Sequence, residues 1–106
     1  MFEVKTDFGT YSDLFLMTSH YCADNSLAVY LVSESEGPFA TLTVCLDDKN
    51  LEDLTNYIDT NNCPWAMDFI EKNGLGKRTG KEKVSGYCIY PQVKFSYDAL
   101  KKAVEE

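Results

Sequence analysis

A histidine and a cysteine are the first side chains in this sequence that could do chemistry. His20, the single histidine, stands two positions before Cys22. On an extended strand the two side chains would share a face, so the imidazole could contact the thiol. A thiol enzyme also needs a group that orients the imidazole, and no recognisable motif ties an Asp or Asn to this pair. We predict a half-exposed His20 beside a core Cys22, no thiol protease and no catalytic residue.

A basic, glycine-rich segment over 74–81 looks at first like a phosphate-binding loop. That pattern requires glycine at position 75 and Ser or Thr at position 82, where this chain has Leu75 and Glu82. The segment also follows a predicted helix, whereas a phosphate loop joins a strand to a helix. We therefore predict a helix end followed by a basic, glycine-punctuated loop over 75–83.

Four carboxylates lie close together in a polar segment: Asp47, Asp48, Glu52 and Asp53. Two such groups could act as general acid and base, but carboxylates in a polar loop are normally solvated. The segment also lacks the glycine and the terminal glutamate of a calcium-binding loop. We expect solvated side chains here, and the sequence assigns no metal site and no cofactor.

The densest motif, Asp59-Thr-Asn-Asn-Cys-Pro-Trp65, stands at the predicted start of a helix. Pro64 suits a first helical turn, Asn62 or Cys63 would cap it, and Gly74 suits the left-handed position after its end. The motif could fix the helix against a sheet, or its free N–H groups could receive an anion. We favour the structural role for its last four residues, Asn62, Cys63, Pro64 and Trp65.

Apolar periodicity predicts the elements that position these residues. Alternating or β-branched runs favour strands over 2–8, 11–21, 26–32, 39–46, 54–58 and 84–95. Turn residues between 26–32 and 39–46 predict a hairpin there, and Pro91 predicts an edge position or a bulge. One helix should follow Pro64, with an apolar stripe of Trp65, Ala66, Phe69 and Ile70. Ser96 should cap a second helix, whose inward residues are Ala99, Leu100, Ala103 and Val104.

These elements predict one domain over residues 1–106. The chain is 44% hydrophobic and 25% charged, which is a normal globular composition. At 106 residues a single core is expected. We predict an α+β fold with a mostly antiparallel sheet of about five or six strands, one face of which is covered by two helices.

The N-terminus and the cysteines indicate a cytoplasmic protein. Acidic residues stand where a secretory signal needs a basic stretch and an apolar run, and no segment approaches the length of a membrane span. The four cysteines, at 22, 45, 63 and 88, contain no C-x-x-C pair. We expect free, buried thiols and no membrane association.

Charge is distributed very unevenly along the chain. Residues 1–71 carry 13 acids against two bases, whereas residues 72–106 carry eight bases against four acids. The two parts therefore have net charges of −11 and +4. A strongly acidic face repels nucleic acid and attracts basic protein surfaces, although the same charges could serve only to keep the protein in solution.

Several segments resemble a family of uncharacterised small bacterial proteins. They are the helix-entry motif continued through Gly76, Ser85-Gly-Tyr-Cys-Ile-Tyr-Pro91, Ser26-Leu-Ala-Val-Tyr-Leu31 and Ala40-Thr-Leu-Thr-Val44. The resemblance spans residues 20–95 and supplies no catalytic residue; the lysine-rich 77–83 stretch could be specific to this chain. It implies a protein carried on plasmids, conjugative elements or phages, where small acidic proteins often resemble inhibitors of host defence.

Two binding hypotheses follow. The first is a non-enzymatic inhibitor of anti-CRISPR or anti-restriction type, whose acidic side chains cover the basic nucleic-acid site of a partner such as a nuclease. Its expected surface is Glu34, Glu36, Asp47, Asp48, Glu52 and Asp53. The alternative is a module that binds nucleic acid or another anion through Lys77, Arg78, Lys81, Lys83, Tyr87 and Tyr90, since single strands bind to bases and aromatic rings together.

Overall fold

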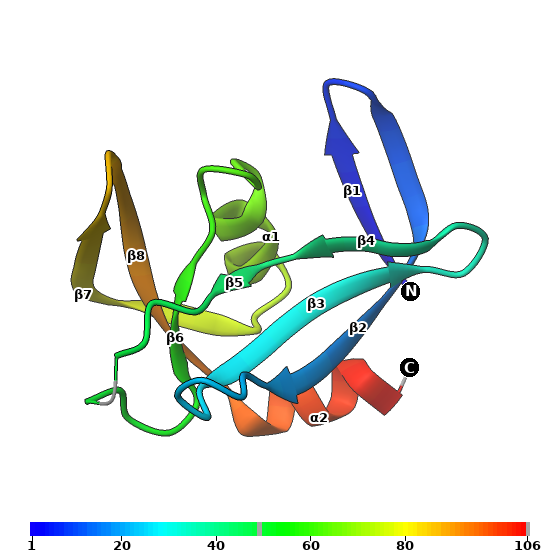
Figure 1. Cartoon of the computed structure of the whole chain (residues 1–106). Coiled ribbons are helices and arrows are strands. Elements are labelled where there is room, and N and C mark those ends of the chain that lie inside the picture. The colour runs from blue at the N-terminus through cyan, green and yellow to red at the C-terminus, as the bar shows by residue number, and fades with distance from the viewer. Residues whose placement is uncertain (49, 106) are drawn as a thin grey trace.

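The computed structural model describes residues 1–48 and 50–105. Within them the chain forms eight strands and two helices (Figure 1). The strands are β1 (Phe2–Thr6), β2 (Gly9–His20), β3 (Leu27–Ser33), β4 (Gly37–Thr41), β5 (Thr43–Val44), β6 (Thr55–Ile58), β7 (Gly76–Ser85) and β8 (Cys88–Phe95). The helices are α1 (Ala66–Lys72), between β6 and β7, and α2 (Tyr97–Glu105) at the end.

The strands form two four-stranded sheets rather than one. Their orders are β1-β2-β3-β4 and β5-β6-β8-β7, and the paired strands are antiparallel. The predicted α+β class and the hairpin of β3 with β4 are confirmed. The single sheet of about five or six strands is wrong, because the segment predicted as one strand over 39–46 divides between the two sheets.

That division occurs at Leu42, between β4 and β5. The Leu42 amide donates to the Val29 carbonyl of β3 at 2.8 Å, while its own carbonyl accepts the Asp59 amide at 2.8 Å. The next side chain, Thr43, accepts the Val29 amide on its hydroxyl at 3.2 Å. One extended segment therefore leaves the first sheet and enters the second without losing backbone hydrogen bonds (Figure 1).

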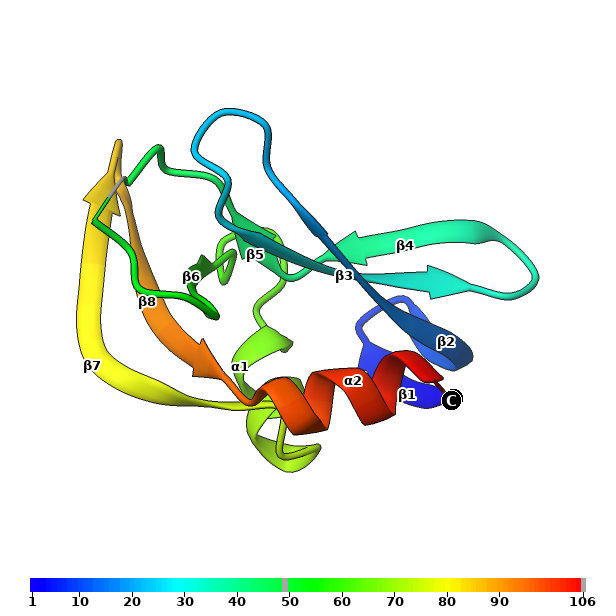
Figure 2. The same cartoon turned by 90° about the horizontal axis from the view of Figure 1, so that it is seen from below.

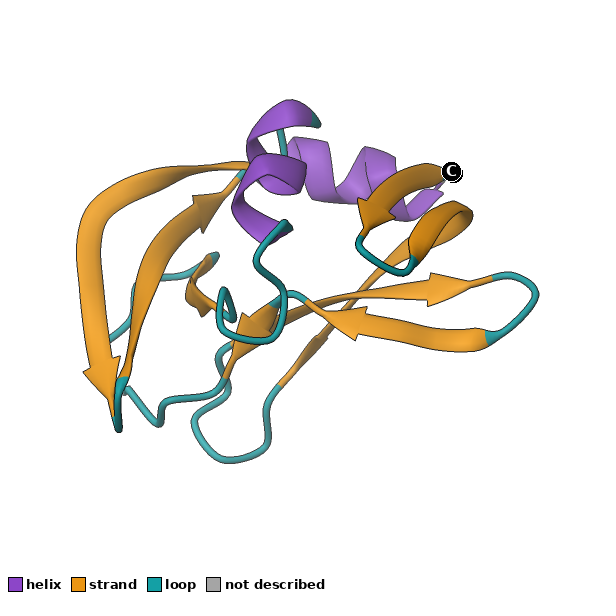
Figure 3. Ribbon diagram, turned by 90° about the horizontal axis from the view of Figure 1, so that it is seen from above, coloured by secondary structure: helices purple, strands orange, loops and turns teal. Residues whose placement is uncertain are grey.

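The helices do not both cover one face of a single sheet. Figure 3 shows α1 between the β7–β8 ribbon and the β1–β2 hairpin, and in Figure 1 α2 lies below β2. The Phe69 ring of α1 meets Phe2 of β1 edge-on at 5.4 Å, and α2 runs along β2 (Figure 2). One core joins the elements; its members include Leu16, Val29, Leu42, Ile58, Ile70, Val93, Phe95 and Leu100.

Only the C-terminal end of α1 has the cap that the sequence predicted. Gly74 has φ +65°, its amide donates to Glu71 and the Leu75 amide donates to Ile70, which together form a Schellman ending. Neither Asn62 nor Cys63 caps the other end, because α1 begins at Ala66 and Trp65 occupies the cap position without a side-chain bond. Instead, the Asp59 carboxylate accepts both Asn62 nitrogens and braces the approach to the helix.

The second helix begins as predicted. Ser96 accepts the Ala99 amide on its hydroxyl at 3.3 Å and the Leu100 amide on its carbonyl at 2.9 Å. Leu100 and Ala103 are buried, whereas Val104 is 40% exposed and is not an inward residue. The apolar stripe of α2 is therefore narrower than the sequence indicated.

The basic segment 75–83 is not a loop. Most of it belongs to β7, which pairs with β8 in two stretches separated by a register shift between Arg78 and Glu82. Its charged residues show no apolar period, so the strand is specified by β8 rather than by its own sequence. Pro91 pairs with Glu82 next to this bulge. It lies outside the three residues of β8 that pair with β6, so it has the edge position beside a bulge that the sequence predicted for a proline.

Asn56 provides a test of how the two sheets are joined. Its side chain is fully buried and donates to the Leu27 carbonyl at 2.7 Å and to the Ser26 hydroxyl at 3.2 Å. Asn56→Ala should lower the free energy of unfolding by about 2 kcal/mol, because it leaves a buried carbonyl unpaired. Urea denaturation measures the loss. The matched control, Asn61→Ala at an exposed position, should stay within about 0.5 kcal/mol of the parent; equal effects of the two changes would contradict this role.

Candidate functional site

An acidic groove runs along one end of β3. Its main cavity has a volume of about 600 Å³, and the carboxylates that line it are Asp24, Asp48, Glu52 and Asp53. A second cavity of about 320 Å³ adjoins it and extends along α2 to Leu100 and Val104. The two cavities share His20, Leu27, Leu54 and Tyr97. The groove therefore combines an anionic end with an apolar floor.

Four parts of the chain, from three separate regions of the sequence, build this groove. They are the end of β2, the turn before β3, the 45–54 segment between β5 and β6, and the first residue of α2. Asn25, Asp47 and Leu54 have left-handed backbone conformations, with φ of 59°, 55° and 64°. This conformation is unusual for leucine, but the Phe95 amide donates to the Leu54 carbonyl at 2.7 Å and holds it.

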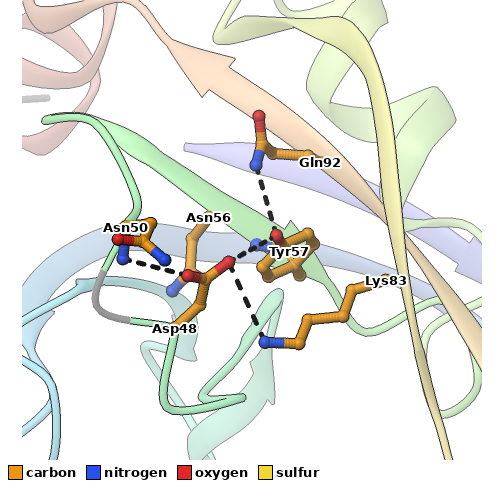
Figure 4. Close-up of polar contacts among 6 residues, drawn as sticks. All are labelled: Asp48, Asn50, Asn56, Tyr57, Lys83 and Gln92. Atoms are coloured by element: carbon orange, nitrogen blue, oxygen red, sulfur yellow. Dashed lines mark hydrogen bonds and ion pairs between the residues drawn. The ribbon is translucent and has the colours of Figure 1, made fainter.

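Asp48 anchors the 45–54 segment to the second sheet (Figure 4). Its carboxylate accepts the Tyr57 hydroxyl at 2.7 Å and the Asn50 amide at 3.0 Å, and Lys83 Nζ lies 3.9 Å away. Gln92 in turn donates to the Tyr57 hydroxyl at 3.4 Å. Asp48 is thus a partly enclosed group of a network that spans β6, β7 and β8, and not the solvated carboxylate that its polar segment predicted.

The network shifts the pKa of both its acidic members. The hydrogen bond from Tyr57, followed by that from the Asn50 amide, holds the pKa of Asp48 below its ordinary value. Burial raises the pKa of Tyr57, and the bond to Asp48 raises it further because the carboxylate favours the protonated phenol. At neutral pH the network therefore contains an ionised Asp48 and a neutral Tyr57.

Asp24 contributes a second constrained carboxylate. Burial opposes its ionisation, but several hydrogen bonds together outweigh burial and lower its pKa; the largest contributions come from the Ser26 hydroxyl at 2.6 Å and the Ser26 amide at 2.9 Å. Both bonds end on Oδ1. Oδ2 is buried and has no hydrogen-bond partner among the described residues. The groove thus carries negative charge that its own hydrogen bonds do not fully compensate.

The structure divides the six predicted acidic residues between two places. Asp48, Glu52 and Asp53 line the groove, and Asp47 is exposed in the same segment. Glu34 and Glu36 lie in the turn between β3 and β4, at the opposite end of β3, so the six do not form one surface (Figure 1). Sequence reasoning missed Asp24, in the turn before β3, and Tyr97, at the start of α2, which both line the groove.

Folding also brings the basic segment against the acids. Two ion pairs join it to the acidic part of the chain, Arg78 to Glu71 at 3.4 Å and Lys83 to Asp48 at 3.9 Å, and Lys94 of β8 lies 3.9 Å from Glu52. Of the other residues proposed for nucleic acid, Lys77 and Lys81 are exposed, Tyr87 is fully exposed at the ribbon tip, and Tyr90 is half-buried opposite Lys83. The two halves of the sequence are thus not separate charged bodies.

The remaining chemical candidates are His20 and the four cysteines. His20 is exposed in the groove, and Cys22 is exposed rather than in the core, because it lies in the turn beyond the end of β2. All four thiols are free, but only Cys63 is buried; burial raises its pKa. Within residues 1–48 and 50–105, no three His, Cys, Asp or Glu side chains are placed to hold a metal ion.

The helix-entry motif lines a different cavity, of about 850 Å³, with the β1–β2 hairpin. Its residues Asn62, Cys63, Pro64 and Trp65 all contribute to the wall. The Trp65 ring lies 5.9 Å from Phe39 and 6.1 Å from Phe69, and the Cys63 thiol donates to the Thr41 carbonyl at 3.7 Å. The contacts with Phe39 and Thr41 attach the start of α1 to β4.

The fold and the groove together define a small two-sheet α+β protein with an anionic cleft. The chain belongs to the family of the domain of unknown function DUF4313, whose model matches residues 15–106. The matched region includes α2, which lies outside residues 20–95, where the sequence resembles a family of small bacterial proteins. No curated protein matches the chain, and no solved structure does. No helix in the described part of the chain has the length and apolar character to span a membrane.

The Asp48 network predicts a pH dependence of stability. A carboxylate whose pKa is lowered by folding stabilises the protein above its unfolded-state pKa of about 3.9, and this contribution disappears as the pH falls through the folded-state value. In Tyr57→Phe the main cause of the shift is absent. Between about pH 5 and pH 2 the free energy of unfolding should therefore fall less steeply for this variant than for the parent. Urea denaturation across this range measures both slopes; Tyr87→Phe should keep the parent slope, and parallel curves for Tyr57→Phe would rule out the network as the source.

Proposed function

We propose that this protein is a non-enzymatic inhibitor that acts in the cytoplasm by binding a basic protein partner in its acidic groove. The observation that carries the proposal is the placement of Asp24, Asp48, Glu52 and Asp53 around one cavity of about 600 Å³. A concave site of this size can enclose a side chain from a partner, whereas a flat acidic surface can only attract one.

The composition of the groove suits lysine or arginine. Such side chains have an apolar stem and a cationic head, so the stem can lie along Leu54 and Tyr97 while the head meets Glu52 and Asp53. Tyr97 is 62% exposed and is available to a partner. The net charge of −7 would also steer a basic protein toward this chain.

A partner that holds nucleic acid presents the matching surface. Basic side chains that bind phosphates would be drawn to carboxylates, and an occupied groove would keep them from nucleic acid. The resemblance to proteins of plasmids, conjugative elements and phages supports a partner from host defence, such as a CRISPR or restriction nuclease. We therefore propose an anti-CRISPR or anti-restriction type of inhibitor.

The separation of the acidic residues supplies a matched pair of variants. Glu52→Gln with Asp53→Asn removes two charges from the groove, and Glu34→Gln with Glu36→Gln removes two from the far end of β3. We expect the tagged protein to capture a basic nuclease from a lysate of a defended host at about 50 mM salt and to release it at about 500 mM. With that nuclease purified, the groove variant should bind about tenfold more weakly and the control less than about twofold more weakly.

The same proteins distinguish the alternatives. Equal weakening in the two variants would mean that net charge acts without the groove, and binding that does not depend on salt would contradict electrostatic recognition. Inhibition is measured directly by cleavage of plasmid DNA by the captured nuclease, which the parent protein should block and the groove variant should block less.

A further inference from the structure

A second charged site lies where the chain passes from the end of α1 into β7. A cavity of about 740 Å³ there is lined by Lys77, Arg78 and Lys94, together with Glu71, Gly74, Gly76, Phe95 and Ser96. We call the three cations the basic corner. They come from two strands, β7 and β8. The positive charge that they bring to one cavity is opposite in sign to the net charge of the protein, which is −7.

Two of these cations oppose each other directly in the sheet. Lys77 of β7 pairs with Lys94 of β8, and both are exposed. Like charges at directly opposed positions destabilise a sheet. An anion placed between the two ammonium groups would turn this repulsion into attraction. The pair is therefore expected to be more stable with a bound anion than without one.

The carboxylates near the corner compensate it only in part. Glu71 lies 3.4 Å from Arg78, and Glu52 lies 3.9 Å from Lys94 in a pair whose side chains are both largely exposed. Lys77 forms no ion pair within the described part of the chain. Exposed pairs of this kind are weak and exchange readily with an incoming anion.

The cavity also has room and a hydrogen-bond donor. A side chain is absent at Gly74, where an added Cβ would meet nothing within 4 Å. The Ser96 hydroxyl accepts the Ala99 amide, so its own proton remains available to a ligand. Cations and a free hydroxyl are groups that bind phosphate oxygens.

We propose that the basic corner binds a phosphate group through Lys77, Arg78 and Lys94. The phosphate could belong to a nucleic-acid strand or to a free phosphorylated compound. A strand would have a further contact, because the ribbon continues from the corner to Tyr87, which is fully exposed at the tip and can stack on a base. Lys83 is not part of this site, since it is engaged with Asp48 and lies 6.0 Å above the Tyr57 ring.

Binding to pyrophosphate and to a short oligothymidylate tests the site. Both are titrated by calorimetry at about 20 mM salt, where phosphate contacts are strongest. Lys77→Gln should weaken each interaction about tenfold, whereas Lys102→Gln, which removes the same charge from an exposed position on α2, should change it less than about twofold. Glu71→Gln should tighten binding, because it releases Arg78 from its carboxylate.

Thermal unfolding gives a readout that does not depend on any activity. Without ligand, Lys77→Gln should melt no lower than the parent, since the repulsion with Lys94 is gone. Pyrophosphate should raise the melting temperature of the parent more than that of the variant. A variant that unfolds at a clearly lower temperature than the parent would show that Lys77 has a structural role and would overturn the proposal.

The two ligands identify the source of the phosphate. Binding of both, with Tyr87→Ala weakening only the oligothymidylate, supports a nucleic-acid strand along the ribbon; binding of pyrophosphate alone supports a free phosphorylated compound. The proposal would be overturned if neither ligand bound, or if Lys77→Gln and Lys102→Gln weakened binding equally. The groove variants are not involved, so failure here leaves the proposed inhibitor function untouched.

Discussion

The hydrogen bonds of Leu42 are the constraint on which the rest of the structure depends. Its amide is bound to β3 in one sheet and its carbonyl to Asp59 at the edge of the other. Because a buried backbone group must be paired, a strand that leaves one sheet can do so only where a second sheet is ready to receive it. This crossing sets the position of the 45–54 segment, and with it the acidic groove beside the start of β3.

The same arrangement brings the oppositely charged parts of the chain into contact. The 45–54 segment lies against β7 and β8, so Lys83 and Lys94 reach Asp48 and Glu52. Glu52 both lines the acidic groove and pairs with a cation of the basic corner. The two proposed sites are therefore electrostatic neighbours, and membership of the DUF4313 family over residues 15–106 includes the residues of both.

Elements with a strong local signal were predictable. The alternation in β1 to β4, the stripe of α1 and the cap residues Gly74 and Ser96 all depend on contacts within a few positions, and these agree with the structure. The strand β7 was not predictable in this way. Its lysines have no apolar period, and what makes it a strand is the ladder that β8 provides.

The candidate site shows the same limit. The sequence by itself determined which side chains are charged, that His20 and the cysteines form no motif, and that the α+β elements are mostly antiparallel, because these follow from residue type and short-range spacing. Only the tertiary structure decided that Asp24 joins Asp48, Glu52 and Asp53, that Glu34 and Glu36 lie elsewhere, and that Lys77 opposes Lys94. Those relations depend on sheet register and on the crossing at Leu42, which bring together residues that no local pattern connects.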